Sequence, residues 1–379
     1  MKKIYDTIHK FIHISDIESN VIYSPLFGRL KFIHQLGLSF YVYPGAHHKR
    51  FEHSIGTMEV ASRIFDAVIS AFELEEEKQK EYRQILRLAA LLHDLGHLPF
   101  SHVAEKAFLK DKSHEDMTYY LITNELDLPE KWIESIAKIA VGPHHTTLPF
   151  NPVEKTLSEI ITGDFFGADR IDYLLRDAYY SGLNYGLFDF HQLIEMMRLI
   201  PFGAENSLNL GVHINGIESS ESLLLARYFM HKRIYQHPSI KAYNFHMARF
   251  MEACFDSSVL QLPNFLHFHD LVVQVEVEKA AFDCLHPLHH EAKPFFDRKN
   301  RCTAIATTDD ISSLFQDLRL GYEEGSQKTK HSFNFPVLKK DGSIESAANL
   351  ISLKIPLLNM NWLYIMPNDE ALIREKLSQ

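Results

Sequence analysis

A histidine and an aspartate stand together at the end of an almost wholly apolar segment. His93 and Asp94 directly follow residues 85–92, in which Ala and Leu dominate and β-branched residues are scarce. That composition favours a buried helix over a strand. Burying an imidazole and a carboxylate is costly unless they have a partner, and a divalent cation binds both. A helix end that reaches solvent is the alternative interpretation.

Two further segments carry side chains of the same kind. His53 precedes a predicted helix over residues 54–72, and Asp169 lies in a predicted helix over residues 168–180. Together with His93 and Asp94 they would supply two nitrogen and two oxygen ligands, and they would leave positions open for water and substrate. Such a site suits hydrolysis, because a metal ion lowers the pKa of bound water and polarises a phosphoryl oxygen. Mn, Fe, Ni, Co and Zn all suit these ligands, and one divalent transition metal is expected.

The elements that must position these side chains are mostly helices. Apolar residues at helical spacing predict further helices at 29–36, 114–126, 130–141, 154–162, 189–198, 216–235 and 370–377. Extended segments are expected at 39–42, 271–277 and 362–365. We therefore expect a mainly α fold, with a helical domain over residues 1–255 and a smaller α+β appendage over residues 256–379.

Composition excludes several classes of protein. The 379 residues carry a formal net charge of −10, which argues against a broad nucleic-acid-binding face. Three scattered cysteines do not make a disulfide framework. There is no apolar run that could cross a bilayer and no signal-peptide core near the start. We expect a cytoplasmic protein without a membrane partner.

The order and surroundings of these residues resemble the HD phosphohydrolase superfamily. The sequence motifs around them are similar to those of its deoxynucleoside triphosphate triphosphohydrolase, or SAMHD-like, branch. The length of the chain is similar to that of the smaller bacterial members of this branch. The matching stretches span roughly residues 4–255 and are residues 29–37, 44–47, 50–54, 91–97, 99–102, 114–115, 169–177 and 231–237.

This resemblance implies a role for each matching residue. It makes His53, His93, Asp94 and Asp169 the metal ligands. It makes Arg50, His97, Arg170, Tyr173 and Arg227 the phosphate-binding set. It places Gln35 and Asp177 at the sugar 3′-hydroxyl, and Tyr235 against the sugar with Gln236 beside it. It makes His102 the proton donor, with Glu105 as its partner, and His114 with Glu115 a supporting acid/base pair.

The residues agree with these roles on physical grounds. Three arginines around one metal would offset the charge of a triphosphate, and guanidinium binds phosphate oxygens in bidentate fashion. Asp169, Tyr173 and Asp177 are spaced by four residues, so on a helix they share one face. The alternative is that Arg50, Arg170 and Arg176 are structural partners of neighbouring carboxylates.

Two features of the chain depart from the family pattern. Glu105 stands where the proton donor's partner is usually an aspartate. Tyr23, Gly28 and Lys31 stand where nucleotide-activated relatives recognise guanine with Asp, Gln and Arg. A tyrosine and a glycine cannot supply that pattern of donors and acceptors. We therefore expect that GTP does not activate this protein.

Three functions remain open from the sequence. The first is hydrolysis of a deoxynucleoside triphosphate to a deoxynucleoside and tripolyphosphate. The second is another phosphoester reaction, such as a nucleotide monophosphatase or a cyclic-nucleotide phosphodiesterase; His114 with His144 or His145 would then bind a second metal. The third is a non-catalytic nucleotide-binding protein.

The resemblance also implies a homo-oligomer. A further cluster, His286, His289, His290 and Glu291, is interpreted as a solvated loop.

Overall fold

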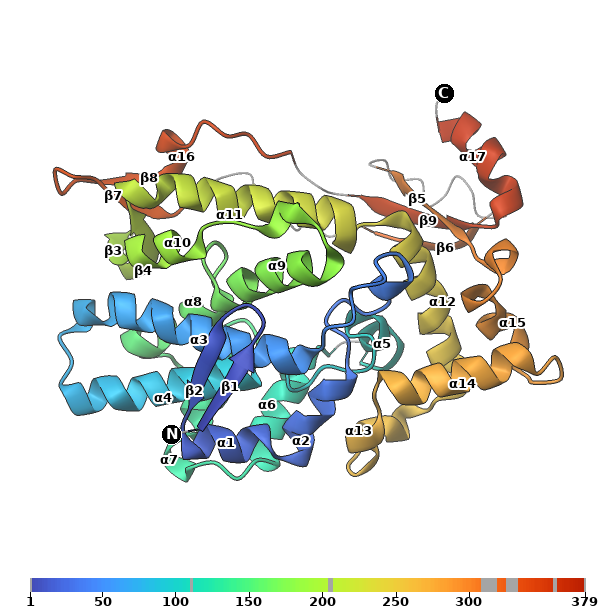
Figure 1. Cartoon of the computed structure of the whole chain (residues 1–379), viewed down its shortest axis with the longest axis horizontal. Coiled ribbons are helices and arrows are strands. Elements are labelled where there is room, and N and C mark those ends of the chain that lie inside the picture. Colours follow the sequence, from blue (N-terminus) through green and yellow to red (C-terminus); the bar gives the residue numbers. More distant parts are fainter. Residues whose placement is uncertain are drawn as a thin grey trace.

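The computed structural model describes residues 2–109, 112–203, 207–307, 319–324, 333–356 and 360–377. Helices dominate it and the sheets are small, so the expected mainly α fold is confirmed (Figure 1). The longer helices are α3 (Arg50–Val68), α4 (Glu76–Leu92), α6 (His114–Asn124), α7 (Glu130–Val141), α8 (Pro152–Thr162), α9 (Ala168–Ser181), α11 (Ile217–Met230), α12 (Pro238–Cys254) and α14 (Asp270–Phe282). None of these described helices combines the length and apolar character that a membrane crossing requires.

Shorter helices connect and extend this frame. They are α1 (Asp16–Ile22), α2 (Pro25–Gly28), α5 (His102–Phe108), α10 (Phe190–Met196), α13 (Asn264–His267), α15 (His289–Ala292), α16 (Ala347–Leu350) and α17 (Glu370–Leu377). A π-helical turn over His231–Tyr235 continues α11. The helices expected at 114–126, 130–141, 154–162, 168–180 and 370–377 are confirmed within two residues at each end.

Three helices form the floor of the site, and their packing follows from their side chains. The last eight residues of α4 are all buried, as their apolar composition predicts. Helix α3 packs between α4 and α9. Gly56 allows α3 to approach α9 closely, because a Cβ at this position would lie 2.0 Å from Asp172 Oδ1 and 2.3 Å from an Arg176 nitrogen. Any larger residue at position 56 would push the two helices apart.

Among the described residues, three small sheets, antiparallel or mixed, complete the fold. An N-terminal hairpin pairs β1 (Lys2–Asp6) with β2 (Lys10–Ile14). A four-stranded sheet has the order β3-β4-β7-β8, and only its β4–β7 pairing is parallel. Its strands are β3 (Met197–Phe202), β4 (Ser207–His213), β7 (Pro336–Leu338) and β8 (Ile344–Ser346). The third sheet has the order β5-β9-β6, from Thr303–Thr307, Asn361–Ile365 and Arg319–Glu323.

The hydrophobic core extends across the boundary that the sequence suggested at residue 255. One cluster of buried apolar side chains includes Ile12 near the start of the chain and Ile351 near its end. A second cluster packs α17 on the third sheet through Ile305, Leu363 and Ile373. A third joins α12 to that sheet. The division of the chain into residues 1–255 and 256–379 stays a prediction.

Three predicted elements are wrong, each because tertiary contacts outweigh local preference. The helix expected over 29–36 is only a 3-10 turn over Arg29–Phe32, because Ile33 O accepts a hydrogen bond from Arg50 N. The extended segment expected over 39–42 is a 3-10 turn over Ser39–Tyr41. The strand expected over 271–277 is part of α14, because Val273, Val277 and Ala280 are buried at helical spacing. The strand expected at 362–365 is confirmed as β9.

Candidate active site

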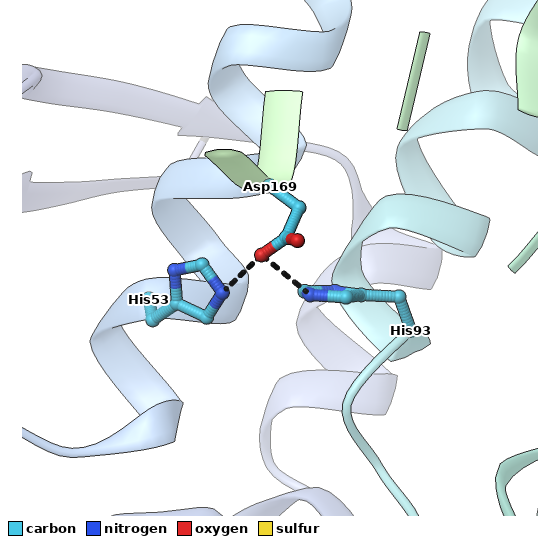
Figure 2. Close-up of side chains that lie close together, drawn as sticks. All are labelled: His53, His93 and Asp169. Carbon is cyan, nitrogen blue, oxygen red and sulfur yellow. Dashed lines mark hydrogen bonds and ion pairs between the residues drawn. The ribbon is translucent and has the colours of Figure 1, made fainter. Parts of the chain in front are cut away.

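Two histidines and an aspartate from three different elements meet in one cluster (Figure 2). His53 comes from the first turn of α3, His93 directly follows α4, and Asp169 comes from the first turn of α9. Asp169 Oδ1 lies 3.0 Å from His53 Nε2 and 3.5 Å from His93 Nε2. Both histidines are buried, whereas the Asp169 side chain is 32% exposed, so the cluster opens to solvent on the aspartate side.

The fourth predicted ligand, Asp94, lies beside this cluster and is shared with neighbouring groups. Its Oδ1 lies 3.4 Å from His93 Nε2, and its Oδ2 lies 3.7 Å from His53 Nε2. Asp94 also accepts a hydrogen bond from Arg50, and its Oδ1 lies 3.3 Å from His97 Nε2. Burial alone would raise the pKa of Asp94, but Arg50, His93 and His97 hold it well below its usual range. Asp94 is therefore an ionised carboxylate that faces the cluster.

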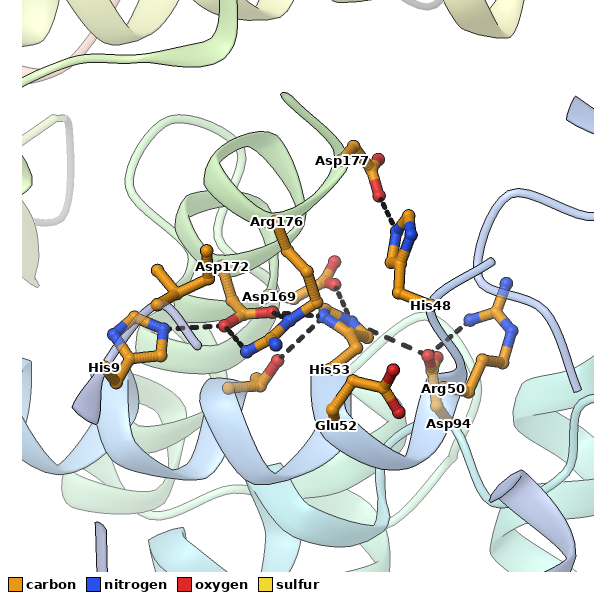
Figure 3. A network of polar contacts seen from close by, with 12 residues as sticks. His9, His48, Arg50, Glu52, His53, Asp94, Asp169, Asp172, Arg176 and Asp177 are labelled. Atoms are coloured by element: carbon orange, nitrogen blue, oxygen red, sulfur yellow. Dashed lines mark hydrogen bonds and ion pairs between the residues drawn. The ribbon is translucent and has the colours of Figure 1, made fainter. Parts of the chain in front are cut away.

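A second layer of polar contacts orients the two imidazoles, and Figure 3 shows the contact of His53 with Asp172. His53 Nδ1 lies 2.7 Å from Asp172 Oδ2, and His93 Nδ1 lies 2.8 Å from the carbonyl oxygen of Ala90. These contacts occupy the Nδ1 atoms, so both Nε2 atoms point to the centre of the cluster. A carboxylate or carbonyl behind each histidine is the usual second shell of a metal site, because it sets the tautomer and the ring orientation.

The carboxylate behind His53 is itself held in a buried ionic network (Figure 3). Arg176 donates to both oxygens of Asp172, at 2.8 and 2.9 Å, and also donates to Asp6 in the N-terminal hairpin. His9 Nε2 lies 2.7 Å from Asp172 Oδ1. None of these four side chains is more than 4% exposed. The hairpin and α9 together hold Asp172 rigidly beneath His53.

The charges of the cluster favour a cation at its centre. Burial alone would lower the pKa of His53, but Asp169 and Asp172 raise it to about 10. The protonated histidine then offsets part of the negative charge of Asp94, Asp169 and Asp172. His93 Nε2 is buried without a hydrogen-bond partner among the described residues, which leaves its lone pair available. Two imidazole nitrogens and two carboxylates fit a divalent transition metal, so this His/Asp cluster could hold one.

The predicted acid/base residues form a neighbouring cluster around Glu105. Glu105 Oε2 lies 3.0 Å from His102 Nδ1, and its Oε1 lies 2.9 Å from His114 Nδ1 and 3.3 Å from His97 Nδ1. His97 and His114 stack with ring centroids 3.7 Å apart. Glu115 Oε2 lies 3.3 Å from His114 Nδ1. Burial, together with Arg50 and His114, lowers the pKa of His97 to about 4, so His97 is neutral near pH 7.

Next to this cluster is a cavity of about 580 Å³. The predicted residues that line it are Gln35, Arg50, His102, Tyr173, Asp177, Tyr235 and Gln236. Arg50 joins the cavity to the metal cluster, because it donates to Asp94 and, at 2.8 Å, to the Ser101 hydroxyl. Phe100 and Ser101 have φ angles of 54° and 58°, in the left-handed region that non-glycine residues rarely adopt. The loop that leads to His102, the first residue of α5, is thus held in a strained conformation.

The residues expected at the sugar are brought together at one side of the cavity. Tyr235 donates a hydrogen bond of 2.6 Å to Asp177 Oδ2, and His48 Nε2 lies 2.8 Å from Asp177 Oδ1. Gln35 Oε1 is buried and has no hydrogen-bond partner among the described residues. Gln236 Oε1 accepts a hydrogen bond from the indole of Trp362. Gln35 is the member of this group with a free acceptor.

Two of the three expected phosphate arginines contact the backbone of the loop before α9. Arg170 donates to Gly163 O at 2.7 Å, and Arg227 donates to Asp164 O at 3.2 Å. Neither lines the cavity, in contrast to Arg50 and Tyr173. The alternative interpretation is that Arg50, Arg170 and Arg176 are structural partners of neighbouring carboxylates. It fits Arg176, which pairs with Asp172. Arg50 pairs with Asp94 and not with Glu52.

The other histidine groups fall outside the first cluster. His145 Nε2 lies 3.8 Å from Glu115 Oε1, and His144 lines a second cavity. The cluster at 286–291 lies in a turn and the short helix α15, where Glu291 pairs with Arg249 at 2.8 Å. Tyr23, one of the residues at the positions where relatives recognise guanine, is 72% exposed. That GTP does not activate the protein stays a prediction.

Several residues that build this site were not predicted as functional. His9 lies far from the predicted metal ligands in sequence and reaches the site only through the fold, whereas His48 lies five residues before His53. Asp172 shares a helix face with Arg176, and that i, i+4 spacing was a usable signal. Asp270 has no comparable local signal. Its Oδ1 accepts from Phe100 N and its Oδ2 from His34 N, both at 2.8 Å, so it ties α14 to the strained loop.

Comparison with known protein families places these elements in context. The HD domain family matches residues 50–173, which contain all four predicted metal ligands. The HD associated region matches residues 188–286.

Relatives of known sequence match a little under two-thirds of the chain. An uncharacterised protein of Methanocaldococcus jannaschii is 36% identical over 241 residues, which cover 64% of this chain and 47% of that protein. The deoxynucleoside triphosphate triphosphohydrolase SAMHD1 of Homo sapiens is 30% identical over 268 residues, which cover 62% of this chain and 42% of that protein. The chain spans about half the length of these curated relatives.

Two solved structures resemble the whole chain. A hypothetical protein from Aquifex aeolicus superposes with a TM-score of 0.79, at 30% identity over 99% of both chains. A phosphohydrolase from Bacteroides thetaiotaomicron superposes with a TM-score of 0.77, covering 96% of this chain and 99% of that one. The second pair is only 22% identical, so it shows the shared fold alone.

Proposed function

The chain belongs to the HD-domain phosphohydrolase superfamily, in its SAMHD-like branch, and on that premise we propose that it hydrolyses deoxynucleoside triphosphates to a deoxynucleoside and tripolyphosphate. One observation carries this proposal. A single cavity is bordered by the metal cluster through Arg50, by the acid/base cluster through His102, and by the paired Asp177 and Tyr235. The phosphates would thus lie at Arg50, the leaving oxygen at His102, and the sugar at Asp177 and Tyr235.

The metal would be held by His53, His93, Asp94 and Asp169. When bound, a divalent metal lowers the pKa of a water molecule and polarises a phosphoryl oxygen. Asp172 and the carbonyl oxygen of Ala90 keep the two imidazoles in the tautomer that presents Nε2. Arg50, fixed by Asp94 and Ser101, would place positive charge beside the phosphate oxygens, where it stabilises the negative charge that develops during attack.

The bond changes follow from the products. The oxygen of water forms a bond to the α-phosphorus, and the bond between that phosphorus and O5′ breaks. The leaving O5′ takes a proton, which His102 would donate. His102 suits this role because its side chain is 64% exposed toward the cavity side of α5 while its Nδ1 is held by Glu105. Glu105, in contact with His97, His102 and His114, would hold the donor in position.

A preference for deoxyribose is expected from the sugar side. Tyr235 is fixed by its hydrogen bond to Asp177, and its ring lies with its centroid 6.0 Å from that of Tyr173. A rigid aromatic ring against C2′ would clash with a 2′-hydroxyl. Gln35, with its free acceptor, would bind the 3′-hydroxyl.

A two-metal phosphodiesterase is the second candidate, and one observation favours it. Asp94, His97 and His114 have ligand atoms within 4.8 Å of one another, directly beside the first cluster. A second metal there would give the paired arrangement used in phosphodiester hydrolysis. Metal content distinguishes the two candidates, because the first requires one metal per chain and the second requires two.

The proposal is tested by product analysis. Metal-free protein is incubated with each deoxynucleoside and ribonucleoside triphosphate, with and without Mn²⁺, and the products are separated by chromatography. We expect metal-dependent release of deoxynucleoside and tripolyphosphate, which the double variant His93→Ala/Asp94→Ala does not produce. Phosphate, pyrophosphate or a nucleoside monophosphate as the product would contradict the proposed reaction.

A further inference from the structure

Part of the cavity wall is built by α12 and by two strands from the C-terminal part of the chain. Strand β6 contributes Gly321, Tyr322 and Glu323 to the cavity wall, and β9 contributes Tyr364. Figure 1 shows the β5-β9-β6 sheet beside α12. Helix α12 adds Ile240, Asn244 and Ala248, which lie on one face at helical spacing. We call this part of the cavity wall, formed by β6, β9, α12 and Lys106 of α5, the far wall.

The far wall is fixed by specific contacts between the sheet and α12. Phe245 and Tyr364 stack with centroids 4.4 Å apart and rings 13° from parallel. Gly321 permits this packing, because a Cβ there would lie 2.6 Å from the Phe245 ring. Cys302 N donates a hydrogen bond of 3.0 Å to His246 Nε2. A wall held by stacking, close approach and a buried hydrogen bond is preorganised before any ligand arrives.

Three charged side chains lie together on this wall. Glu323 Oε1 lies 2.9 Å from Lys106 Nζ and 3.1 Å from Lys241 Nζ. Tyr364 donates a hydrogen bond of 2.8 Å to Glu323 Oε2. Although burial alone would raise it, the two lysines lower the pKa of Glu323 to about 2, so it is ionised near pH 7. The three groups, which we call the lysine–glutamate trio, carry a net charge of +1.

The trio lines the same cavity as His102, Asp177 and Tyr235. His102 and Lys106 are four residues apart on α5, so they lie on the same face about 6 Å apart along the helix axis. Both line the cavity. A nucleoside whose O5′ is at His102 and whose sugar is at Asp177 and Tyr235 would extend its base toward Lys106. The base edge remote from the sugar carries position 6 of a purine or position 4 of a pyrimidine.

A neighbouring amide adds a group with an unused hydrogen-bonding atom. Asn244 Oδ1 is buried and has no hydrogen-bond partner in the part of the chain that the structure describes. An amide offers an acceptor at one end and two donors at the other. A buried polar atom without a partner is costly, and a ligand that binds it removes that cost. Asn244 therefore points to a polar ligand at the far wall.

We propose that the far wall is the nucleobase subsite and that the lysine–glutamate trio selects bases with a keto oxygen at the remote edge, namely guanine and thymine. The lysine ammonium groups donate to O6 of guanine or O4 of thymine, and Glu323 accepts from the adjacent ring N–H. Adenine and cytosine present an amino group to the lysines, which sets donor against donor. This inference rests on the proposed function, because the nucleotide is placed by His102 and the sugar residues.

The test measures kcat/KM for the four deoxynucleoside triphosphates with the wild type and with Lys106→Met and Lys241→Met. The wild type is expected to favour dGTP and dTTP over dATP and dCTP by about tenfold, the effect of one hydrogen bond to a charged group. Each methionine variant is expected to reduce that ratio at least about threefold. Lys279→Met is the matched control, because Lys279 pairs with Glu276 at 2.7 Å, outside the cavity lining.

A second measurement separates this inference from the proposed reaction. Calorimetric titration with the four free deoxynucleosides, which carry no phosphate, reports the base subsite alone. Tighter binding of deoxyguanosine and thymidine, lost in the two methionine variants, supports the subsite even if no triphosphate is hydrolysed. Equal kcat/KM for all four triphosphates, or base ratios that both variants leave unchanged, would overturn the inference even if every triphosphate is hydrolysed.

Discussion

The metal cluster and the far wall border one cavity, yet they are built in opposite ways. The metal cluster takes its residues from α3, from the residues that directly follow α4 and from α9. Each of these residues has a side chain of a type that binds metals. The far wall takes its residues from α5, α12, β6 and β9, and none is distinctive alone. Glu323 acquires its role only through two lysines that lie 82 and 217 positions earlier in the chain. The residues of the metal cluster can therefore be recognised by their types in the sequence, whereas the shape and selectivity of the cavity depend on tertiary contacts.

The largest expected effect concerns the metal cluster. Asp169→Ala removes the carboxylate that contacts both histidines, so metal content is expected to fall below about one tenth per chain. Hydrolysis is expected to fall by at least about 10³-fold, because the metal supplies several kcal/mol of transition-state stabilisation. Elemental analysis and product release measure the two effects. Asp66→Ala, an exposed carboxylate on α3, is the control. A full metal complement in Asp169→Ala would show that the cluster is assigned wrongly.

The next effect concerns the buried network beneath His53. Asp172→Asn leaves Arg176 with one fewer buried partner charge and weakens the support of the imidazole. The free energy of unfolding is expected to fall by about 3–5 kcal/mol, and metal affinity by about 10–100-fold. Denaturant titration and metal titration measure these. Asp66→Asn, which breaks an exposed pair with Arg83, is expected to cost less than about 1 kcal/mol. Equal losses in the two variants would contradict the supporting role.

A smaller effect tests whether Asp270, in the C-terminal part of the chain, contributes to catalysis. Asp270→Asn removes one of the two acceptors that hold Phe100 N and His34 N. The loop that leads to His102 is then less well placed, and kcat is expected to fall about 10–100-fold with KM and metal content unchanged. Steady-state kinetics and elemental analysis measure these, with Asp256→Asn as an exposed control. A change in KM alone would argue that Asp270 shapes the pocket and not the loop.

The smallest effect concerns the junction of α12 with the C-terminal sheet. Burial lowers the pKa of His246 to about 4 from 6.5, so the folded protein keeps this histidine neutral. Below about pH 6.5 the unfolded chain binds a proton that the folded chain does not, and stability is lost as the pH falls toward 4. The loss is expected to reach about 2 kcal/mol near pH 5 and to be absent in His246→Asn. Urea titrations near pH 7.5 and pH 5 measure it, and parallel pH profiles would contradict it.

The same contrast explains which parts of the molecule could be predicted from the sequence. His93 and Asp94 after an apolar helix indicate a metal site because few other partners suit them. The helix expected over 54–72 spans Arg50–Val68, so His53 lies in its first turn and not before it. The segment 271–277 was misjudged because its valines favour a strand, while burial of Val273 and Val277 selects a helix. Tyr364 lay in a correctly predicted strand, but its contact with Glu323 depends on the strand order β5-β9-β6, which no local pattern encodes.

The central claim is that water attacks the α-phosphorus of a deoxynucleoside triphosphate at the metal cluster. The most direct test is hydrolysis in ¹⁸O-labelled water, followed by phosphorus NMR and mass spectrometry of the products. We predict one ¹⁸O atom in tripolyphosphate, on a terminal phosphorus, and none in the deoxynucleoside. Label in inorganic phosphate or pyrophosphate, or in the deoxynucleoside, would show that the bond to O5′ is not cleaved in this way and would contradict the claim.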